Sequence, residues 1–292
     1  MPGANARAQQ KATGLNCDGL IFDLEDAVAP DAKVAARGTI VESLGTHNYE
    51  YRERIVRVNG LATPWGEEDI AALHGVPLDA VLIPKVESAE MVRAAADCLA
   101  ALVPAAGPLQ LWVMIESPRS ILALEEICAA LVQANKNLAA EAVQESPPVL
   151  VMGTSDLVQD LRAQHTLDRE PLIYALTKAV TVARAFGLDI LDGVHLDFRN
   201  LETFRRSCEQ GKTMGFDGRS LIHPGQVELA NELYGVAKDE VDYAKRVLQV
   251  WNEAQANGLG VVELDGQLIE NLHASEARRV LAMAAAAERS AE

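Results

Sequence analysis

The sequence predicts an α/β fold in which a parallel sheet closes into a (β/α)8 barrel. Short apolar segments such as "GLIFDL" and "AVLIPKV" alternate along the chain with longer amphipathic ones. Strands that are apolar almost throughout indicate a parallel sheet covered by helices on both faces. Polar residues follow each of these strands, and in a barrel all carboxyl ends face one mouth. A doubly wound sheet is less favoured, because neither GxGxxG nor GxxxxGK[ST] follows any strand.

The predicted strands are short and evenly distributed, at 19–24, 54–59, 80–86, 109–116, 148–156, 188–194 and 218–224. Amphipathic segments predict helices between them, at 88–102, 117–132 and 171–187. The barrel needs one more strand, which would precede "PGANAR", where the chain starts. We therefore expect either that the first strand is missing or that the barrel is open or closed by another element.

The last part of the sequence changes character and predicts an arm appended to the barrel. We expect residues 1–255 to form the catalytic barrel domain and residues 256–292 to form a hairpin and a helix. The hairpin "GVVELDGQLI" has Asp265 and Gly266 at its turn, a pair typical of two-residue loops. Ser275 is the candidate N-cap of the helix. The arm could be a lid or an element exchanged between subunits, or it could simply cover the base of the barrel.

Composition and charge exclude several classes of function. The 292 residues carry a formal net charge of −16, which argues against nucleic acid as the main partner. No apolar run reaches the length of a membrane span, and the N-terminus lacks the pattern of a signal peptide. The scattered cysteines form no CxxC pair, so we expect no disulfide framework and a cytoplasmic location. These are Cys17, Cys98, Cys128 and Cys208.

Two carboxylates, Glu116 and Asp156, end successive predicted strands and are candidate ligands of Mg²⁺. Magnesium prefers oxygen ligands and keeps several of its waters, so two carboxylates suit it better than they suit Zn²⁺. The alternative is that each carboxylate caps the helix that follows, which fits Asp156 in "TSDL" especially. Spacing alone leaves both interpretations open.

Two cations, Arg57 and Lys85, also end strands that should open into the mouth. Arg57 could bind a substrate carboxylate through two parallel hydrogen bonds, or it could pair with the acids at residues 23–26. Lys85 could form a Schiff base, but a mouth rich in carboxylates would raise its pKa and oppose that chemistry. An ion pair with one of those carboxylates is the alternative. For His223, at the end of the last strand, a structural role is favoured over a catalytic one.

Eight motifs together carry a resemblance that covers about residues 2–285. They are "PGANARAQQKA", "GLIFDLEDAVAPDAKVAAR", "RVNGLATPWGEEDI", "VLIPKVES", "VMIESPRSIL", "MGTSDLVQDL", "LDGVHLDFRN" and "GFDGRSLIHPGQV", in that order. The chain resembles the citrate lyase β-subunit-like family of the HpcH/HpaI aldolase superfamily, which includes malyl-CoA and citramalyl-CoA lyases. The resemblance implies a (β/α)8 barrel that is trimeric or a dimer of trimers, binds Mg²⁺ and acts on a CoA thioester.

The resemblance also implies roles for individual residues. The family's metal-binding pair falls on Glu116 and Asp156, and its carboxylate-binding arginine on Arg57. The acids of "LEDAV", Glu25 and Asp26, fall near the waters of the metal. Contacts to the CoA phosphates are implied for two residues near the start, Arg7 and Lys11. An acid on the arm that reaches a neighbouring subunit's site falls on Glu270, where the family usually has Asp.

The implied reaction is the cleavage of a citramalyl-CoA or malyl-CoA type thioester into acetyl-CoA and a 2-oxo acid. In that reaction Arg57 would clamp the carboxylate, Asp26 would lie beside the ion, and Glu270 would exchange a proton with the enolate. Three alternatives stay open: cleavage of a citryl thioester, hydrolysis of the thioester on the same scaffold, and a relative that binds ligands without catalysis. The sequence identifies no residue that selects the oxo acid.

Overall fold

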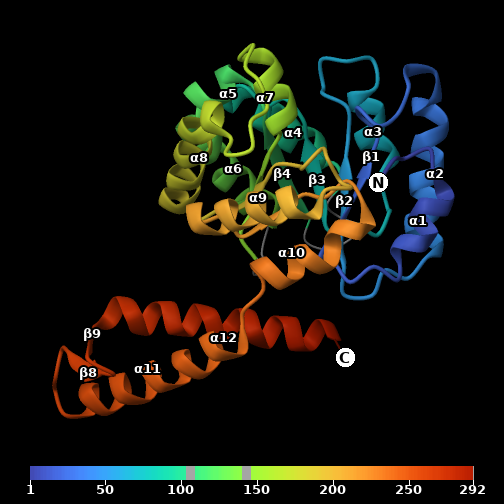
Figure 1. Ribbon diagram of the computed structural model, residues 1–292. Helices are drawn as coiled ribbons and strands as arrows, with labels where there is room; N and C mark the ends of the chain where they lie inside the picture. The colour runs from blue at the N-terminus through green and yellow to red at the C-terminus, as the bar shows by residue number, and fades with distance from the viewer. Residues whose placement is uncertain (103–108, 140–145, 292) are drawn as a thin grey trace. The chain divides into compact units, whose positions relative to one another are not determined.

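The structure is a computed structural model that describes residues 1–102, 109–139 and 146–291. These residues form two compact units, Met1–Ala230 and Asn231–Glu292. The first unit is a seven-stranded parallel sheet in the order β1 to β7, curled as in a TIM barrel, with helices around its outside (Figure 1). The predicted fold class is therefore confirmed. The predicted division into a barrel domain of residues 1–255 and an arm of residues 256–292 stays a prediction.

The strands of the first unit match the predicted positions, although the last one is short. They are β1 (Gly19–Asp23), β2 (Glu53–Arg57), β3 (Ala80–Ile83), β4 (Gln110–Ile115), β5 (Val149–Met152), β6 (Asp189–Asp192) and β7 (Gly218–Arg219). Each pairs in parallel with the next, for example Asp23 with Arg57 and Leu82 with Trp112. Short strands of this kind are typical of barrels, where side chains alternate between the interior and the helices.

The helices of the first unit follow the strands as expected for βα units. They are α1 (Ala6–Ala12), α2 (Lys33–Thr46), α3 (Gly66–Ala72), α4 (Ala89–Ala100), α5 (Pro118–Leu122), α6 (Leu124–Ala139), α7 (Thr154–Asp160), α8 (Ile173–Phe186), α9 (Leu201–Met214) and α10 (Val227–Tyr234), which crosses the unit boundary. Short 3₁₀ turns are η1 (Pro30–Ala32), η3 (Glu170–Leu172) and η4 (Pro224–Gln226). The helix predicted at 117–132 divides at Ala123 into α5 and α6.

The edge of β1 is extended by the first residues of the chain. Pro2 forms a parallel bridge with Asp23, and the N–H of Gly3 donates to the Asp23 carbonyl at 2.8 Å. A Cβ on Gly3 would lie 2.6 Å from that carbonyl oxygen, so only glycine allows this approach. Residues 1–3 thus add only a single bridge to the edge of β1, whereas the sequence predicts the eighth strand before Pro2, and α1 begins at Ala6.

The interior of the barrel is filled by alternate residues of successive strands. Its buried members are Ile55, Ala80, Leu82, Trp112, Met114, Val149 and Val151, with Ile21 and Leu191 packed against them. Burial of this apolar surface is the main stabilising term of the fold. The inward register that these residues establish also determines which polar side chains reach the mouth.

The second unit is a helical arm with a hairpin at one end (Figure 1). It contains α11 (Lys238–Ala256), β8 (Val262–Leu264), β9 (Gln267–Ile269) and α12 (Asn271–Ala291). Both turn residues have the positive φ that an Asp-Gly type I′ turn requires, 54° at Asp265 and 80° at Gly266. The predicted start of the last helix is wrong, because α12 begins at Asn271 and Ser275 lies inside it.

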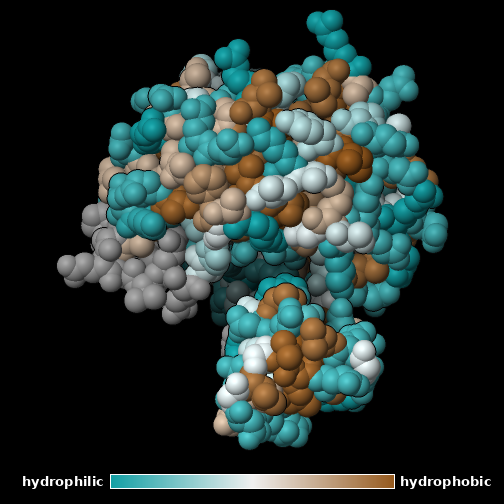
Figure 2. Space-filling model, turned by 90° about the vertical axis from the view of Figure 1, so that its left-hand side faces the viewer, coloured by the Kyte–Doolittle hydropathy of each residue, from teal (hydrophilic) through white to brown (hydrophobic). Residues whose placement is uncertain are grey.

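The arm buries one side of its elements and exposes apolar residues on another. Its core is Ala244, Val247, Trp251, Ile269, Ala274 and Ala277. Figure 2 shows apolar surface on this unit, and its exposed large apolar side chains among the described residues are Tyr243, Leu259, Val261, Leu268 and Leu272. No helix in the described part of the chain is long and apolar enough to cross a bilayer.

Candidate active site

The inward register of the strands brings polar side chains together at the carboxyl ends of the sheet. Asp23, Arg57 and Glu116 each lie two positions after a side chain of the barrel interior. Because side chains alternate along a strand, these three continue the interior-facing rows into the mouth. The structure therefore brings the predicted residues of β1, β2 and β4 to one place.

Arg57 is held by the acids at the end of β1. Its Nε and Nη2 atoms donate to the two carboxylate oxygens of Asp23, both at 2.6 Å, and its Nη1 lies 3.0 Å from Glu25 Oε2. Burial alone would lower the pKa of Arg57, but the hydrogen bonds and charges of these acids raise it. Burial likewise raises the pKa of Asp23, yet its bonds to Arg57 leave it below the usual value. The structural ion pair, one of the two predicted roles of Arg57, is present.

Lys85 reaches the same acids from the end of β3. Its Nζ lies 2.7 Å from Glu25 Oε1 and 3.5 Å from both Asp26 Oδ1 and Asp156 Oδ2. Burial lowers the pKa of Lys85, but the hydrogen bond to Glu25 and the charges of the acids raise it above its usual value. A Schiff-base lysine needs a lowered pKa, so the structure favours the ion-pair interpretation.

Glu116 is the most enclosed acid of the group. Its Oε1 accepts the backbone N–H of Lys85 at 2.7 Å, and its Oε2 lies so close to Gly153 that a Cβ there would be 2.3 Å away. Burial raises the pKa of Glu116 to about 7, and the charges of Glu25 and Asp156 add to this effect. Such a shift shows that the negative charge of Glu116 is incompletely compensated by the protein alone.

Asp156 lies in the first turn of α7, which follows Gly153 directly. Its partially exposed side chain interacts with Lys85 and no side-chain cap of α7 is formed at Gly153, the N-cap position. The predicted alternative, that Asp156 caps the helix, is therefore not what the structure shows, because Asp156 lies inside the first turn. Acids in a first turn still interact favourably with the helix dipole.

Sequence reasoning missed Lys33, whose side chain binds the backbone of the acidic turn that follows β1. Lys33 is buried, and its Nζ donates to the carbonyl oxygens of Leu24 and Glu25 at 2.9 and 3.0 Å. Its ammonium also lies 5.1 Å from the centre of the Trp65 ring. Lys33 lies within the motif "GLIFDLEDAVAPDAKVAAR", but that motif predicts roles only for its acids, and a lysine at the start of a helix is usually exposed.

The remaining predicted residues lie on α1, in the second unit and at the start of η4. Arg7 and Lys11 are exposed and one turn apart on α1, which starts at the carboxyl end of β1. Glu270 belongs to the second unit, where its N–H donates to His273 Nδ1 at 3.0 Å. His223 caps η4 by accepting the N–H of Gly225 and stacks on Phe198, as the structural role predicts.

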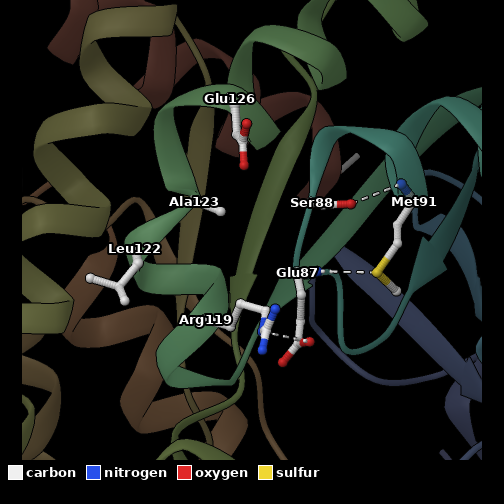
Figure 3. Close-up of a pocket in the computed structure, with 7 residues that line it drawn as sticks. All are labelled: Glu87, Ser88, Met91, Arg119, Leu122, Ala123 and Glu126. Atoms are coloured by element: carbon white, nitrogen blue, oxygen red, sulfur yellow. Dashed lines mark hydrogen bonds and ion pairs between the residues drawn. The ribbon is translucent and has the colours of Figure 1, made fainter.

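A recess of about 480 Å³ borders the loops that follow Lys85 and Glu116. Figure 3 shows its mixed lining, which consists of Glu87, Ser88, Met91, Arg119, Leu122, Ala123 and Glu126. Ser117, the residue after Glu116, donates to Glu87 at 2.6 Å, and Arg119 lies 3.6 Å from the same carboxylate. The recess is thus lined by α4, α5, α6 and the turns before them, and none of Glu25, Asp26, Glu116 or Asp156 is among its lining residues.

The donor set fits a magnesium ion better than any other cofactor. The candidate metal donors here are all carboxylate oxygens, with the cations Arg57 and Lys85 beside them, and among the described residues no three His, Cys, Asp or Glu side chains are arranged to hold an ion by themselves. Magnesium is usually bound by one or two carboxylates with waters and substrate completing its shell. Glu116 and Asp156 can supply those carboxylates, and the raised pKa of Glu116 would be relieved by a cation.

Comparison with known proteins identifies the family. The HpcH/HpaI aldolase/citrate lyase family matches over residues 1–224. The chain belongs to this family. Family membership makes the protein an enzyme, in agreement with the convergence of charged residues at the carboxyl ends of the sheet.

Characterised members of the family differ in their reactions. The chain is 43% identical to a (3S)-malyl-CoA thioesterase of Cereibacter sphaeroides over 286 residues, which are 98% of this chain and 93% of that protein. It is 33% identical to the citrate lyase subunit beta of Escherichia coli, over 97% of this chain and 91% of the other. The predicted family is thus confirmed, while the finer prediction of a lyase is not.

Solved structures give the same fold. Protein CitE from Mycobacterium tuberculosis, in complex with magnesium, acetoacetate and coenzyme A, matches with a TM-score of 0.72. It is 25% identical and the match covers 98% of this chain and 96% of that one. RipC from Yersinia pestis matches over 82% of this chain with a TM-score of 0.65. At least one family member of this fold therefore binds magnesium and coenzyme A.

Proposed function

We propose that the protein is a magnesium-dependent enzyme that hydrolyses a 3-hydroxyacyl-CoA thioester of the malyl-CoA type. The observation that carries this proposal is the 43% identity to a (3S)-malyl-CoA thioesterase, which extends over 98% of the chain. The cluster of acids and cations at the carboxyl ends of the strands is consistent with it. Water would add to the thioester carbonyl, the C–S bond would break, and free CoA and a hydroxy acid would result.

Glu116 and Asp156 are the proposed ligands of the ion. A bound Mg²⁺ would supply Lewis-acid stabilisation of negative charge that develops on the substrate. The backbone N–H of Lys85 fixes Glu116 Oε1, and the tight contact with Gly153 fixes Glu116 Oε2. The protein thus orients one ligand before any ion binds, which limits the reorganisation that binding requires.

Arg57 is the proposed anchor for the substrate's free carboxylate. One edge of its guanidinium is bound to Asp23, which fixes the plane of the group. The edge with Nη1 and Nη2 would then bind the substrate carboxylate. Asp26, whose side chain is 55% exposed, is the proposed acceptor of a proton from water, and Glu25 would help to hold that water.

The CoA carrier would be bound by cations at the rim. Arg7 and Lys11 are one turn apart on α1 and exposed, so both can reach the same phosphate group. The chain as a whole is strongly acidic, with a formal net charge of −16, so local cations are needed to hold a polyanionic carrier.

A second candidate is the lyase reaction, which the similarity to citrate lyase β subunits favours. Here the 3-hydroxyl of malyl-CoA loses its proton, the C2–C3 bond breaks, and glyoxylate and the enolate of acetyl-CoA result. The enolate needs a proton, and Glu270 of a neighbouring copy in a homotrimer is the proposed donor. Glu270 would have no such task in hydrolysis, so Glu270→Gln separates the two reactions.

The test is incubation with (3S)-malyl-CoA, with and without Mg²⁺, while both product pairs are measured. Hydrolysis releases a free thiol, which is measured with a thiol reagent, together with malate. Cleavage releases glyoxylate, which is trapped as its phenylhydrazone, and leaves acetyl-CoA without free thiol. Thiol release that depends on Mg²⁺ supports the proposal, and glyoxylate without thiol would establish the second candidate.

Two further outcomes of the same assay would replace the proposal. Turnover of citramalyl-CoA or of a citryl thioester, but not of malyl-CoA, would assign another substrate. No turnover of any of these thioesters would favour a ligand-binding relative without catalysis. Glu116→Gln is the matched inactive control, since it keeps the size of a proposed metal ligand and removes its charge.

A further inference from the structure

Lys85 interacts with four acidic residues at the carboxyl ends of the strands. Its side chain lies 2.7 Å from Glu25 and 3.5 Å from both Asp26 and Asp156, and its backbone N–H binds Glu116. These acids come from the carboxyl ends of β1, β4 and β5. An ammonium with several carboxylates around it occupies the same kind of position that a metal ion would occupy.

The two cations of the cluster differ in how firmly they are held. The side chain of Arg57 is 15% exposed and bonded bidentately to Asp23, so it is fixed in place. The side chain of Lys85 is 50% exposed and interacts through one nitrogen atom. A lysine stem has several rotatable bonds, and its ammonium is strongly hydrated, so this group can move into water at little cost.

The backbone of Lys85 is fixed although its side chain can move. Lys85 has φ of 52°, a left-handed conformation that is uncommon for residues other than glycine. The hydrogen bond from its N–H to Glu116 holds this conformation beside the proposed metal ligand. Strained backbone of this kind is found often at functional sites, where surrounding contacts stabilise it.

We propose that Lys85 is an internal counter-ion, which neutralises the acidic cluster in the metal-free protein and is displaced when Mg²⁺ binds. The inference rests on the proposed magnesium site and deepens it. The ammonium and the ion compete for oxygens of Glu25 and Asp156, so each weakens the binding of the other. Lys85 thereby keeps the empty cluster stable and sets the affinity of the site for the ion.

The experiment compares Lys85→Met with the unaltered full-length chain. Mg²⁺ affinity is measured by titration calorimetry, and the thermal midpoint is measured in EDTA and in saturating Mg²⁺. We expect the variant to bind Mg²⁺ about tenfold more tightly, because the competing charge is gone. In EDTA its midpoint should fall by about 2–4 °C, and this difference should disappear in saturating Mg²⁺.

Two further variants serve as controls. Lys178→Met removes a lysine that lies 3.8 Å from Glu125 on α6, away from the strand ends, and should leave Mg²⁺ affinity unchanged. Lys85→Arg keeps the charge and should leave both the affinity and the midpoint in EDTA close to those of the unaltered chain.

The sign of the change decides the matter. Weaker Mg²⁺ binding by Lys85→Met would mean that Lys85 orients the ligands instead of competing with the ion, and would overturn the inference. Unchanged affinity would also overturn it while leaving the magnesium site intact. If the unaltered chain itself binds no Mg²⁺, the proposed magnesium site fails first and the inference fails with it.

Discussion

The two ends of the sheet both collect carboxylates, but they compensate them in different ways. At the carboxyl ends, Arg57 binds Asp23 and Glu25, at and just after the end of β1, and Lys85 joins the same Glu25 to Asp156 of α7. At the amino ends, Arg54 binds Asp79 at 2.8 Å through both Nε and Nη2, and that pair is about one-third exposed. One end thus joins several charges into a network, whereas the other forms separate pairs at the surface.

The amino ends contain a half-buried acid, Glu53, that these ion pairs do not include. Glu53, at the start of β2, forms no ion pair within the described part of the chain. Burial raises its pKa to about 7, and Asp79, Asp18 and Asp189 add to the shift. Burial and the charge of Asp217 likewise raise the pKa of Asp189 to about 6.

A raised pKa alone therefore does not locate the active site, because Glu53 and Glu116 are shifted alike. The carboxyl ends are distinguished by geometry. Asp23, Arg57 and Glu116 there follow the interior register, and Lys85, whose side chain is 50% exposed, adopts a left-handed backbone beside them. These features favour a site that accepts a cation and an anionic substrate, which is also where barrel enzymes carry their chemistry.

The largest difference between the two ends should appear in activity. Glu116→Gln is expected to lower kcat/KM for the thioester by about 10³-fold or more, since the ion and its charge stabilisation are lost. Glu53→Gln, the matched change at the other end of the sheet, should stay within about twofold, because Glu53 touches no reacting group. Steady-state kinetics at saturating Mg²⁺ measure both values. Equal losses of kcat/KM in the two variants would contradict a functional difference between the two ends of the sheet.

The two arginines of β2 should differ in how much their replacement lowers the free energy of unfolding. Arg57→Met leaves Asp23, whose side chain is 6% exposed, without its ion pair, so we expect a loss of about 3–5 kcal/mol in the free energy of unfolding. Arg54→Met affects Asp79, which is 39% exposed, and should cost about 0–1 kcal/mol. Urea denaturation of both variants gives the comparison. A small loss for Arg57→Met would show that Asp23 gains access to water when Arg57 is removed.

Much of the first unit could be predicted from periodicity and strand ends. The strands were predictable because each is a short apolar run between polar segments, and their parallel order follows from the helices between them. The hairpin was predictable from Asp265-Gly266, whose turn type is local. The start of α12 was not, because Asn271 and Ser275 are both residues that favour an N-cap, and the helix begins at the first of them, next to Ile269 of β9 in the core of the arm.

The candidate site was predictable as a set of residues but not as a network. Spacing places Arg57 and Glu116 at strand ends, yet it cannot tell that Arg57 binds Asp23 bidentately. The support by Lys33 depends on how α2 packs under the turn after β1, which is a tertiary contact with no sequence signature. The close contact of Gly153 with Glu116 is invisible for the same reason.

That contact yields a prediction of intermediate size. A Cβ in Gly153→Ala would lie 2.3 Å from Glu116 Oε2, and Glu116 is too enclosed to move freely. We expect a loss of about 1–3 kcal/mol in stability and weaker Mg²⁺ binding. Gly19→Ala, at the amino end of β1, would place its Cβ 3.1 Å from Ile55 Cδ1, the end of a flexible side chain, and 3.6 Å from Glu53 Cβ and O, and should cost less than about 1 kcal/mol. Calorimetry and urea denaturation together measure the pair, and similar effects would argue against a special role for the Gly153 contact.

The smallest expected effect is on the pH dependence of stability, and it concerns the amino ends. The pKa of Glu53 in the folded protein is raised from 4.5 to about 7, so the folded state binds more protons than the unfolded state between those values. The contribution of Glu53 to stability must therefore fall as pH rises from about 4.5 to about 7. Glu53→Gln removes this proton uptake, and its free energy of unfolding should fall less over that window, by about 1–2 kcal/mol.

The control is Glu42→Gln, which changes an exposed acid of α2 and should give a curve parallel to that of the unaltered chain. Urea denaturation at several pH values in EDTA keeps metal binding at the other end of the sheet out of the comparison. If the curve for Glu53→Gln is also parallel to that of the unaltered chain, the charge of Glu53 is compensated by another group. That outcome would contradict the raised pKa expected from its surroundings. A flatter curve for Glu53→Gln would show that the uncompensated charge of Glu53 at the amino ends destabilises the folded protein. That effect would be independent of the charges at the candidate site.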